Sequence, residues 1–424
     1  MRSWVALFFL IVILVLGAAV FAQNSPKGVP QSVTVPLTLD QGRVVIDVDI
    51  LLPDGSTERV RGWVDNGTPD LCMSRRVADL IGLSVRCDGQ VCSGTPKSLA
   101  VSAGIAIGGM KIPLSIREAR VSVRSPALAP GMSAEINLPS SLLRGYDVLI
   151  NFPAREFSIG LPGTLKFNGV KSKMLVNPSN GLIQIPSKIE NKSCDLSLDL
   201  GSSINFLAED LFDKLSNSHR DWPHMTGAVG PFNTGGRGDE TTWKLMRVDR
   251  VQFGPLFLTD VAVVDLPAEI GKDRTDHFEA RPGFSTTGLL SAEALLNYRV
   301  GLDYAHATVF FDIGRTVRFP DFDVVGLILR PEIDRVFTIV ALADYAGNSV
   351  PEVQAGDHLV AVDDNPVADF TLGEVWSLLE GSPGQERRLT IARAGKQFTV
   401  VAKVQHFLGD VPGISDTRGK SKKN

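Results

Sequence analysis

Two short segments of the sequence each carry an aspartate that is followed two residues later by a glycine. They are Asp65-Asn66-Gly67-Thr68 and Asp199-Leu200-Gly201-Ser202. Two carboxylates that lie side by side cannot both ionise easily, so one can keep its proton while the other is charged. Such a pair can act as an acid and a base on the same molecule. Whether these two carboxylates meet depends on the elements that carry them.

The first segment comes at the end of a predicted β-hairpin. Val44, Ile46, Val48 and Ile50 alternate with other residues, and this two-residue period is typical of a strand. Residues 53–56 are turn formers, and residues 57–64 return toward the aspartate. We expect a short helix to follow, with Ser74 as its N-cap.

The second segment has the same surroundings. Residues 182–189 are a predicted strand, residues 190–192 a turn, and residues 194–198 the return strand that ends at Asp199. We expect a helix here too, because Phe206, Leu207, Leu211 and Leu215 have helical spacing.

The two copies also end alike. Residues 143–152 align with residues 295–304 without a gap, so that Tyr146 matches Tyr298 and Val148 matches Val300. Each stretch leads into a final predicted strand, residues 156–159 in the first copy and 308–311 in the second. The sequence therefore indicates a tandem duplication.

An Asp-x-Gly-(Ser/Thr) segment at the end of a returning strand, once per copy, resembles the pepsin and retropepsin aspartic proteases. The resemblance covers about residues 33–315. The chain looks most like the bacterial retropepsin-like proteins that carry a C-terminal PDZ domain. This resemblance implies a mainly β, all-β fold with two acid-protease-like lobes in tandem, residues 33–163 and 164–315.

The resemblance implies an endopeptidase in which Asp65 and Asp199 hold one water and need no cofactor or metal. The supporting turns would comprise Asn66, Gly67, Thr68, Leu200, Gly201 and Ser202. The family usually has Thr or Ser between the aspartate and the glycine, where this chain has Asn66 and Leu200. It also has an apolar-apolar-Gly element, where this chain has Ser291 in one copy and residues 136–139 in the other. A binding or scaffold protein without catalysis is therefore the alternative.

The C-terminal part resembles a PDZ domain over residues 320–405. Residues 353–367 match the PDZ pattern of a Gly-Asp turn, an apolar strand and a polar hairpin, and Thr371 and Glu374 form a predicted capping box. PDZ domains bind the C-terminus of a peptide or protein as an added strand. The resemblance implies that this groove is formed by Gly326, Leu327, Ile328 and Leu372.

The residue pattern at the N-terminus predicts that the protein is exported from the cytoplasm. Residues 1–22 are a basic start and a long apolar stretch before a polar segment, which indicates a cleaved signal peptide or, alternatively, a membrane anchor. Either way the remainder would be periplasmic or secreted. A Cys87–Cys92 disulfide would fit an oxidising compartment. Cys72 and Cys194 are a second pair or two thiols.

Charge and residue spacing give no support for nucleic acid or zinc as a partner. The net charge of −4 gives no electrostatic reason to expect nucleic acid. The six histidines are scattered and no Cys-x-x-Cys occurs, so no zinc site is predicted. Residues 406–424 end in a basic run and are predicted to be a disordered tail.

Overall fold

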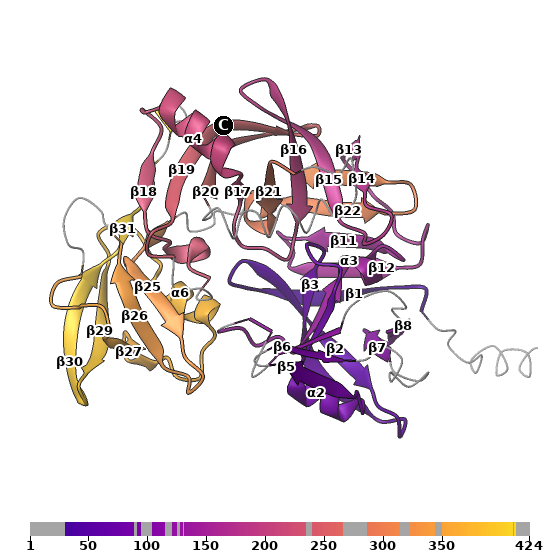
Figure 1. Cartoon of the computed structure of the whole chain (residues 1–424), viewed down its shortest axis with the longest axis horizontal. Coiled ribbons are helices and arrows are strands. Elements are labelled where there is room, and N and C mark those ends of the chain that lie inside the picture. The colour runs from indigo at the N-terminus through magenta and orange to yellow at the C-terminus, as the bar shows by residue number, and fades with distance from the viewer. Residues whose placement is uncertain are drawn as a thin grey trace, which may run out of the picture.

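The computed structural model describes residues 30–88, 91–94, 104–114, 121–124, 128–129, 131–234, 240–265, 286–313, 322–343, 350–409 and 411–412. Strands predominate, which confirms the all-β fold class. Figure 1 shows three groups of strands, which follow one another along the chain from indigo to yellow. The predicted signal peptide or anchor lies outside the described residues, and so does most of the tail. Within the described part, no helix has the length and apolar character needed to cross a membrane.

The first lobe opens with the predicted hairpin and helix. Ser74 caps α2, because its side chain accepts a hydrogen bond from the backbone N–H of Val77. The elements of this lobe are β1 (Ser32–Asp40), β2 (Arg43–Leu51), β3 (Thr57–Asp65), β4 (Leu71–Ser74), α2 (Arg75–Leu80), β5 (Val85–Asp88), β6 (Val91–Gly94), β7 (Gly104–Ile107), β8 (Met110–Pro113), β9 (Val121–Arg124), β10 (Ile136–Pro139), α3 (Ser140–Leu143), β11 (Asp147–Asn151) and β12 (Glu156–Gly160).

The second lobe repeats this order with one correction to the sequence prediction. Phe206 and Leu207 form a strand, β17, and the helix begins only at Glu209, because β17 fits between two strands of the sheet. The elements of this lobe are β13 (Val170–Lys173), β14 (Leu175–Val176), β15 (Ile183–Ile189), β16 (Lys192–Asp199), β17 (Phe206–Leu207), α4 (Glu209–Ser218), β18 (His224–Thr226), η2 (Gly230–Phe232), β19 (Lys244–Phe253), β20 (Leu256–Asp265), β21 (Gly288–Ser291), η3 (Ala292–Leu295), β22 (Tyr298–Asp303) and β23 (Thr308–Ile313).

One sheet joins the two lobes, and its strand order is symmetric. In the order β13-β23-β22-β11-β12-β1, the final hairpin of the second lobe (β22 and β23) lies beside the final hairpin of the first lobe (β11 and β12). The two hairpins pair through β22 and β11. Leu149 lies opposite Gly301 at the centre, and Val148 and Ile150 lie opposite Leu302 and Val300. The closing segments that match in sequence are thus the strands that join the lobes.

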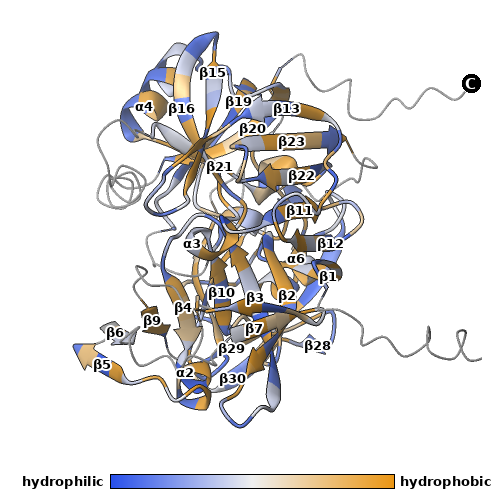
Figure 2. Ribbon diagram, turned by 90° about the vertical axis from the view of Figure 1, so that its right-hand side faces the viewer, coloured by the Kyte–Doolittle hydropathy of each residue, from blue (hydrophilic) through white to orange (hydrophobic). Residues whose placement is uncertain are grey.

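The predicted alternation decides which side chains form the core. Val44, Ile46, Val48 and Ile50 are at most 1% exposed, whereas Asp47 between them is exposed. Burying each such side chain stabilises the fold by roughly 1.5–3 kcal/mol. A single apolar cluster extends through both lobes, and Figure 2 shows the hydrophobic residues concentrated on the strands.

The C-terminal unit is a small sheet with one helix across it. Its sheet order is β25-β26-β27-β29-β30, and the predicted capping box of Thr371 and Glu374 is present at the start of α6. Its elements are β24 (Asp323–Val324), β25 (Leu327–Pro331), β26 (Phe337–Leu342), β27 (His358–Val362), β28 (Asn365–Pro366), α6 (Leu372–Leu379), β29 (Glu386–Arg393), β30 (Lys396–Lys403) and β31 (Gln405–His406).

The prediction that a disordered tail begins at residue 406 is wrong for residues 406–408. His406 belongs to β31, which pairs with β24, and Phe407 and Leu408 are at most 2% exposed. Apolar burial holds these residues in the fold, because Phe407 and Leu408 belong to the same apolar cluster as the C-terminal unit. Further along, the backbone N–H of Val411 donates to Asp260 of the second lobe.

Candidate active site

Asp65 and Asp199 occupy equivalent positions in the two lobes. Asp65 ends β3 and lies opposite Pro139 of the parallel strand β10. Asp199 ends β16 and lies opposite Ser291 of the parallel strand β21. Ser291 therefore lies directly beside Asp199 in the sheet.

The two aspartates meet across the boundary between the lobes. Asp65 is 5% exposed and Asp199 is 6% exposed. A methyl group on Gly67 would collide with the carboxylate of Asp199, and one on Gly201 would lie 2.7 Å from Oδ1 of Asp65. Each glycine therefore lies against the aspartate of the other lobe, and only the absence of a side chain permits this approach.

Polar groups around the carboxylates hold them in place. The backbone N–H of Gly201 donates to Oδ1 of Asp199 at 2.9 Å. The amide of Asn137 lies 3.5 Å from Oδ2 of Asp65, and it is itself fixed by the carbonyl of Asp70 and the N–H of Cys72. Asn137 was not predicted as a site residue, although a polar residue in the buried strand 136–139 was a visible signal.

Asn66 makes two hydrogen bonds to the strand end that carries Asp199. Its amide nitrogen donates to the carbonyl of Leu198 at 2.8 Å, and its amide oxygen accepts from the N–H of Leu200 at 2.6 Å. The side chain of Leu200 cannot return such bonds and is buried among apolar residues. A single side chain of the first lobe thus provides two hydrogen bonds to the second lobe.

Trp63 and Arg43 complete the surroundings on the first lobe. The indole N–H of Trp63 donates to the carbonyl of Gly201 at 3.0 Å, which is a further hydrogen bond between the lobes. The guanidinium of Arg43 lies over the Trp63 ring, 5.4 Å from its centroid. Neither residue was predicted, because a single Trp or Arg in a strand carries no spacing signal.

The environment favours a protonated Asp65. Burial, with a smaller contribution from the charge of Asp199, raises the pKa of the Asp65 carboxyl to about 8, while Asn137 and Arg43 act in the opposite direction. Asp65 therefore keeps its proton at neutral pH. This is the protonation state that a combined acid and base requires.

Thr68 and Ser202 shape the turns that follow the aspartates. The Thr68 hydroxyl accepts from the N–H of Asp70 at 3.4 Å. The Ser202 hydroxyl accepts from the N–H of Ile204 and donates to its carbonyl. Both are local turn contacts.

The four predicted peptide-binding residues lie together, but they are covered. Leu327, Ile328 and Leu372 are at most 3% exposed. A methyl group on Gly326 would lie 2.5 Å from the ring of Phe407. These residues therefore lie beneath other parts of the chain.

The cysteines divide into one bridge and two thiols. Cys87 and Cys92 lie opposite each other on β5 and β6 and form a disulfide. Cys72 and Cys194 are free, and burial raises the pKa of the Cys194 thiol to about 11. No group of His, Cys, Asp and Glu side chains among the described residues could hold a metal ion.

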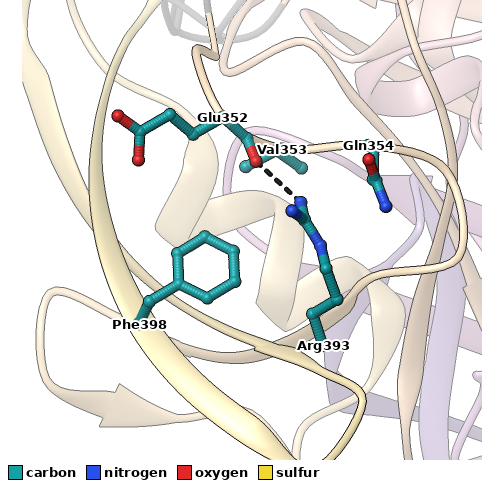
Figure 3. A pocket seen from close by; sticks show the side chains of 5 residues that line it. All are labelled: Glu352, Val353, Gln354, Arg393 and Phe398. Atoms are coloured by element: carbon teal, nitrogen blue, oxygen red, sulfur yellow. Dashed lines mark hydrogen bonds between the residues drawn. The ribbon is translucent and has the colours of Figure 1, made fainter.

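A surface depression of about 580 Å³ lies in the C-terminal unit, apart from the aspartates. Figure 3 shows Arg393 reaching toward the carbonyl of Glu352, with Phe398 beside it. The guanidinium also binds both carboxylate oxygens of Asp357 at 2.6 and 2.7 Å, and it lies over the Phe398 ring. These contacts give Arg393 a structural role.

No family model and no curated protein matches the chain. Among solved structures, the crystal structure of aspartic proteinase from Irpex lacteus matches with a TM-score of 0.40 and 11% sequence identity. That match covers 67% of this chain and 98% of the fungal chain. A likeness at this level establishes no activity for the chain, so the case for a site rests on the side chains described above.

Proposed function

We propose that this chain is an aspartic-type endopeptidase whose dyad is Asp65 and Asp199. The observation that carries the proposal is the contact of each aspartate with the glycine of the opposite lobe. Two related strand ends deliver two buried carboxylates to one place.

The chemistry would use one water between the carboxylates. The ionised carboxylate takes a proton from the water while the water oxygen attacks the peptide carbonyl carbon, and protonated Asp65 donates its proton to the carbonyl oxygen. The tetrahedral intermediate then collapses: Asp199, now protonated, donates its proton to the leaving amine nitrogen, ionised Asp65 takes a proton from a hydroxyl of the intermediate, and the C–N bond breaks. The products are an acid and an amine, and the dyad regains one shared proton.

Two further parts of the proposal concern setting and partners. The C-terminal unit would be a PDZ-like domain that binds a peptide or protein C-terminus. The chain would work in the periplasm or outside the cell, where the Cys87–Cys92 disulfide is stable. The N-terminal apolar stretch would either be cleaved or anchor the protein to the membrane.

The experiment compares Asp65→Asn and Asp199→Asn with the wild-type protein. A peptide mixture is incubated at pH 3–8, with and without pepstatin, and new termini are counted by mass spectrometry. We expect each variant to lose at least about a thousandfold in rate, because acid and base act as a unit. Asp213→Asn, an exposed position on α4, is the matched control and should retain full activity.

The alternative is a scaffold protein that has lost catalysis. The observation that favours it is Leu200, which provides no hydrogen bond from its side chain to the first lobe. If the wild-type protein binds peptides but cleaves none between pH 3 and 8, the scaffold function is correct and the peptidase function is wrong. Cleavage that persists in both Asn variants would point to another site or to a contaminant.

A further inference from the structure

One edge of β25 is the place where an added strand would lie. β25 begins the sheet of the C-terminal unit and pairs with β26 along its other edge. Among the described residues, no strand pairs with its outer edge. Backbone N–H and C=O groups on such an edge need partners, and a PDZ-like domain offers them to a peptide.

A side chain of the second lobe takes the position of that strand. The amide oxygen of Asn233 accepts from the N–H of Leu329 at 3.0 Å, and its amide nitrogen donates to the carbonyl of Leu329 at 3.1 Å. One residue thus bonds both backbone groups of Leu329, as a residue of a neighbouring antiparallel strand does. Asn233 is fully buried in this position.

Apolar residues next to Asn233 fill the space between the strand and the helix. Val229 and Phe232 are fully buried, and they belong to one cluster with Leu327, Leu372 and Trp376. The 3-10 helix η2, which carries Phe232, contacts α6 directly. Residues 229–233 therefore lie in the cleft between β25 and α6.

The 229–233 segment is part of the second lobe. It follows β18 directly, and the backbone N–H of Ala228 donates to the carbonyl of Glu240 at 2.8 Å. Ile204, which follows the turn at Asp199, belongs to the same apolar cluster as Val229 and Phe232. The cleft is thus connected by packing to the segment that carries one aspartate.

The other wall of the cleft is attached to the first lobe. The Thr371 hydroxyl, at the start of α6, donates to Asp40 at 2.9 Å, and the N–H of Leu372 donates to the carbonyl of Gly131 at 2.9 Å. Asp40 is close to Arg43, whose charge acts on Asp65. The C-terminal unit therefore contacts the second lobe through β25 and α6, and the first lobe through the start of α6.

We propose that residues 229–233 are an intramolecular ligand of the PDZ-like groove, and that a peptide enters the groove only after this segment leaves it. The proposal rests on the PDZ-like assignment of the C-terminal unit and not on catalysis. A ligand tethered in the same chain has a high effective concentration, so it keeps the groove closed to weak external peptides.

The test uses the full chain in an Asp65→Asn background, so that a failure of catalysis cannot affect the result. The probe is a fluorescent peptide with the sequence of residues 226–234, capped at both ends. Asn233→Ala should bind this probe about tenfold or more tightly than the parent chain, because the tethered competitor is weakened. Asn168→Ala removes an exposed amide elsewhere and should bind it like the parent chain. Equal binding by Asn233→Ala and its parent, or no binding by either, overturns the proposal.

Hydrogen exchange of the strand gives an independent readout. Fragments that cover Leu327–Pro331 should exchange about tenfold faster in Asn233→Ala, because the N–H of Leu329 loses its partner. Fragments that cover β29 should be unchanged. Unchanged exchange in β25 would show that Asn233 does not act as the added strand.

The Asn233→Asp variant replaces Asn233→Ala in this test if the alanine variant does not fold. A protonated aspartic acid can still donate to the carbonyl of Leu329, whereas the ionised form cannot and places a charge in an apolar cleft. Probe binding by this variant should therefore rise with pH from 4 to 8, while that of its parent stays low. A variant that shows no such pH dependence contradicts the proposal.

Discussion

At the scale of single residues, Asn66 links the first lobe to the strand end that carries Asp199. It bonds Leu198 and Leu200, on either side of Asp199, although these residues are more than 130 positions away in the sequence. Its amide both donates and accepts, so one side chain can satisfy two backbone groups of the other lobe. This explains how an apolar residue can occupy position 200.

Replacing Asn66 tests this role. Asn66→Ala should lower the free energy of unfolding by about 1–3 kcal/mol, because two buried backbone groups lose their partners. Asn66→Thr should recover part of that loss, since a hydroxyl can also donate and accept. Denaturant unfolding and peptide cleavage should follow the same order. Equal stability of all three proteins would contradict the inferred role.

Burial of Asp65 makes stability depend on pH. Its pKa is raised from the ordinary 3.8 to about 8, so the folded protein holds a proton that the unfolded chain releases. This stabilisation is complete below pH 4 and is lost as the pH rises toward 8. Asp65→Asn should therefore gain stability relative to the wild-type protein over that range, as measured by urea unfolding. A constant difference from pH 4 to 8 would contradict this prediction.

At the scale of elements, an ion pair between a buried carboxylate and a partly exposed arginine fixes the turn before β27. The Asp357 side chain is 1% exposed and is bonded by Arg393 of β29 and by the N–H of Gln354. The hydrogen bonds and charge of Arg393 lower the pKa of the Asp357 carboxyl. The turn, and with it the start of β27, thus depends on a residue in another strand.

Arg393→Met should destabilise the C-terminal unit, because it leaves a buried carboxylate without its cation. We expect a lower melting temperature, with a smaller loss than for a fully buried pair, since Arg393 itself is partly exposed. Arg393→Met combined with Asp357→Asn should be more stable than the single variant. Calorimetric melting of the three proteins measures this, and a double variant that melts below the single one would refute it.

At the scale of the whole molecule, the lobes are held together at the β11–β22 pair. Gly301 lies at the centre of that pair, and a methyl group there would collide with the ring of Phe167, which is stacked on Phe310 at 5.0 Å. The ring packs against β22, one of the two strands that join the lobes. The packing of this ring on β22 therefore depends on a small residue at position 301.

Gly301→Ala should cost about 1–3 kcal/mol through overpacking. Adding Phe167→Leu should relieve the collision, so the two changes together should cost less than the sum of each alone. Denaturant unfolding of the four proteins of this cycle measures the coupling. Strict additivity would show that the ring and residue 301 do not compete for space.

The sequence by itself determined the local features of this protein. Alternation predicted β2 and β3, turn residues placed the two aspartates at equivalent strand ends, and the capping box predicted the start of α6. These signals depend on residues close together in the chain, where period and turn chemistry act directly.

Only the tertiary structure decided which distant segments meet. Phe206 and Leu207 have helical spacing but form a strand, because β20 and β21 provide hydrogen-bond partners on both sides. Asn233 fills the groove at Leu329, 96 residues away, and no local pattern marks it. A buried polar side chain can satisfy many possible backbone groups, so its partner is fixed only when the packing of the elements brings one of them within hydrogen-bond distance.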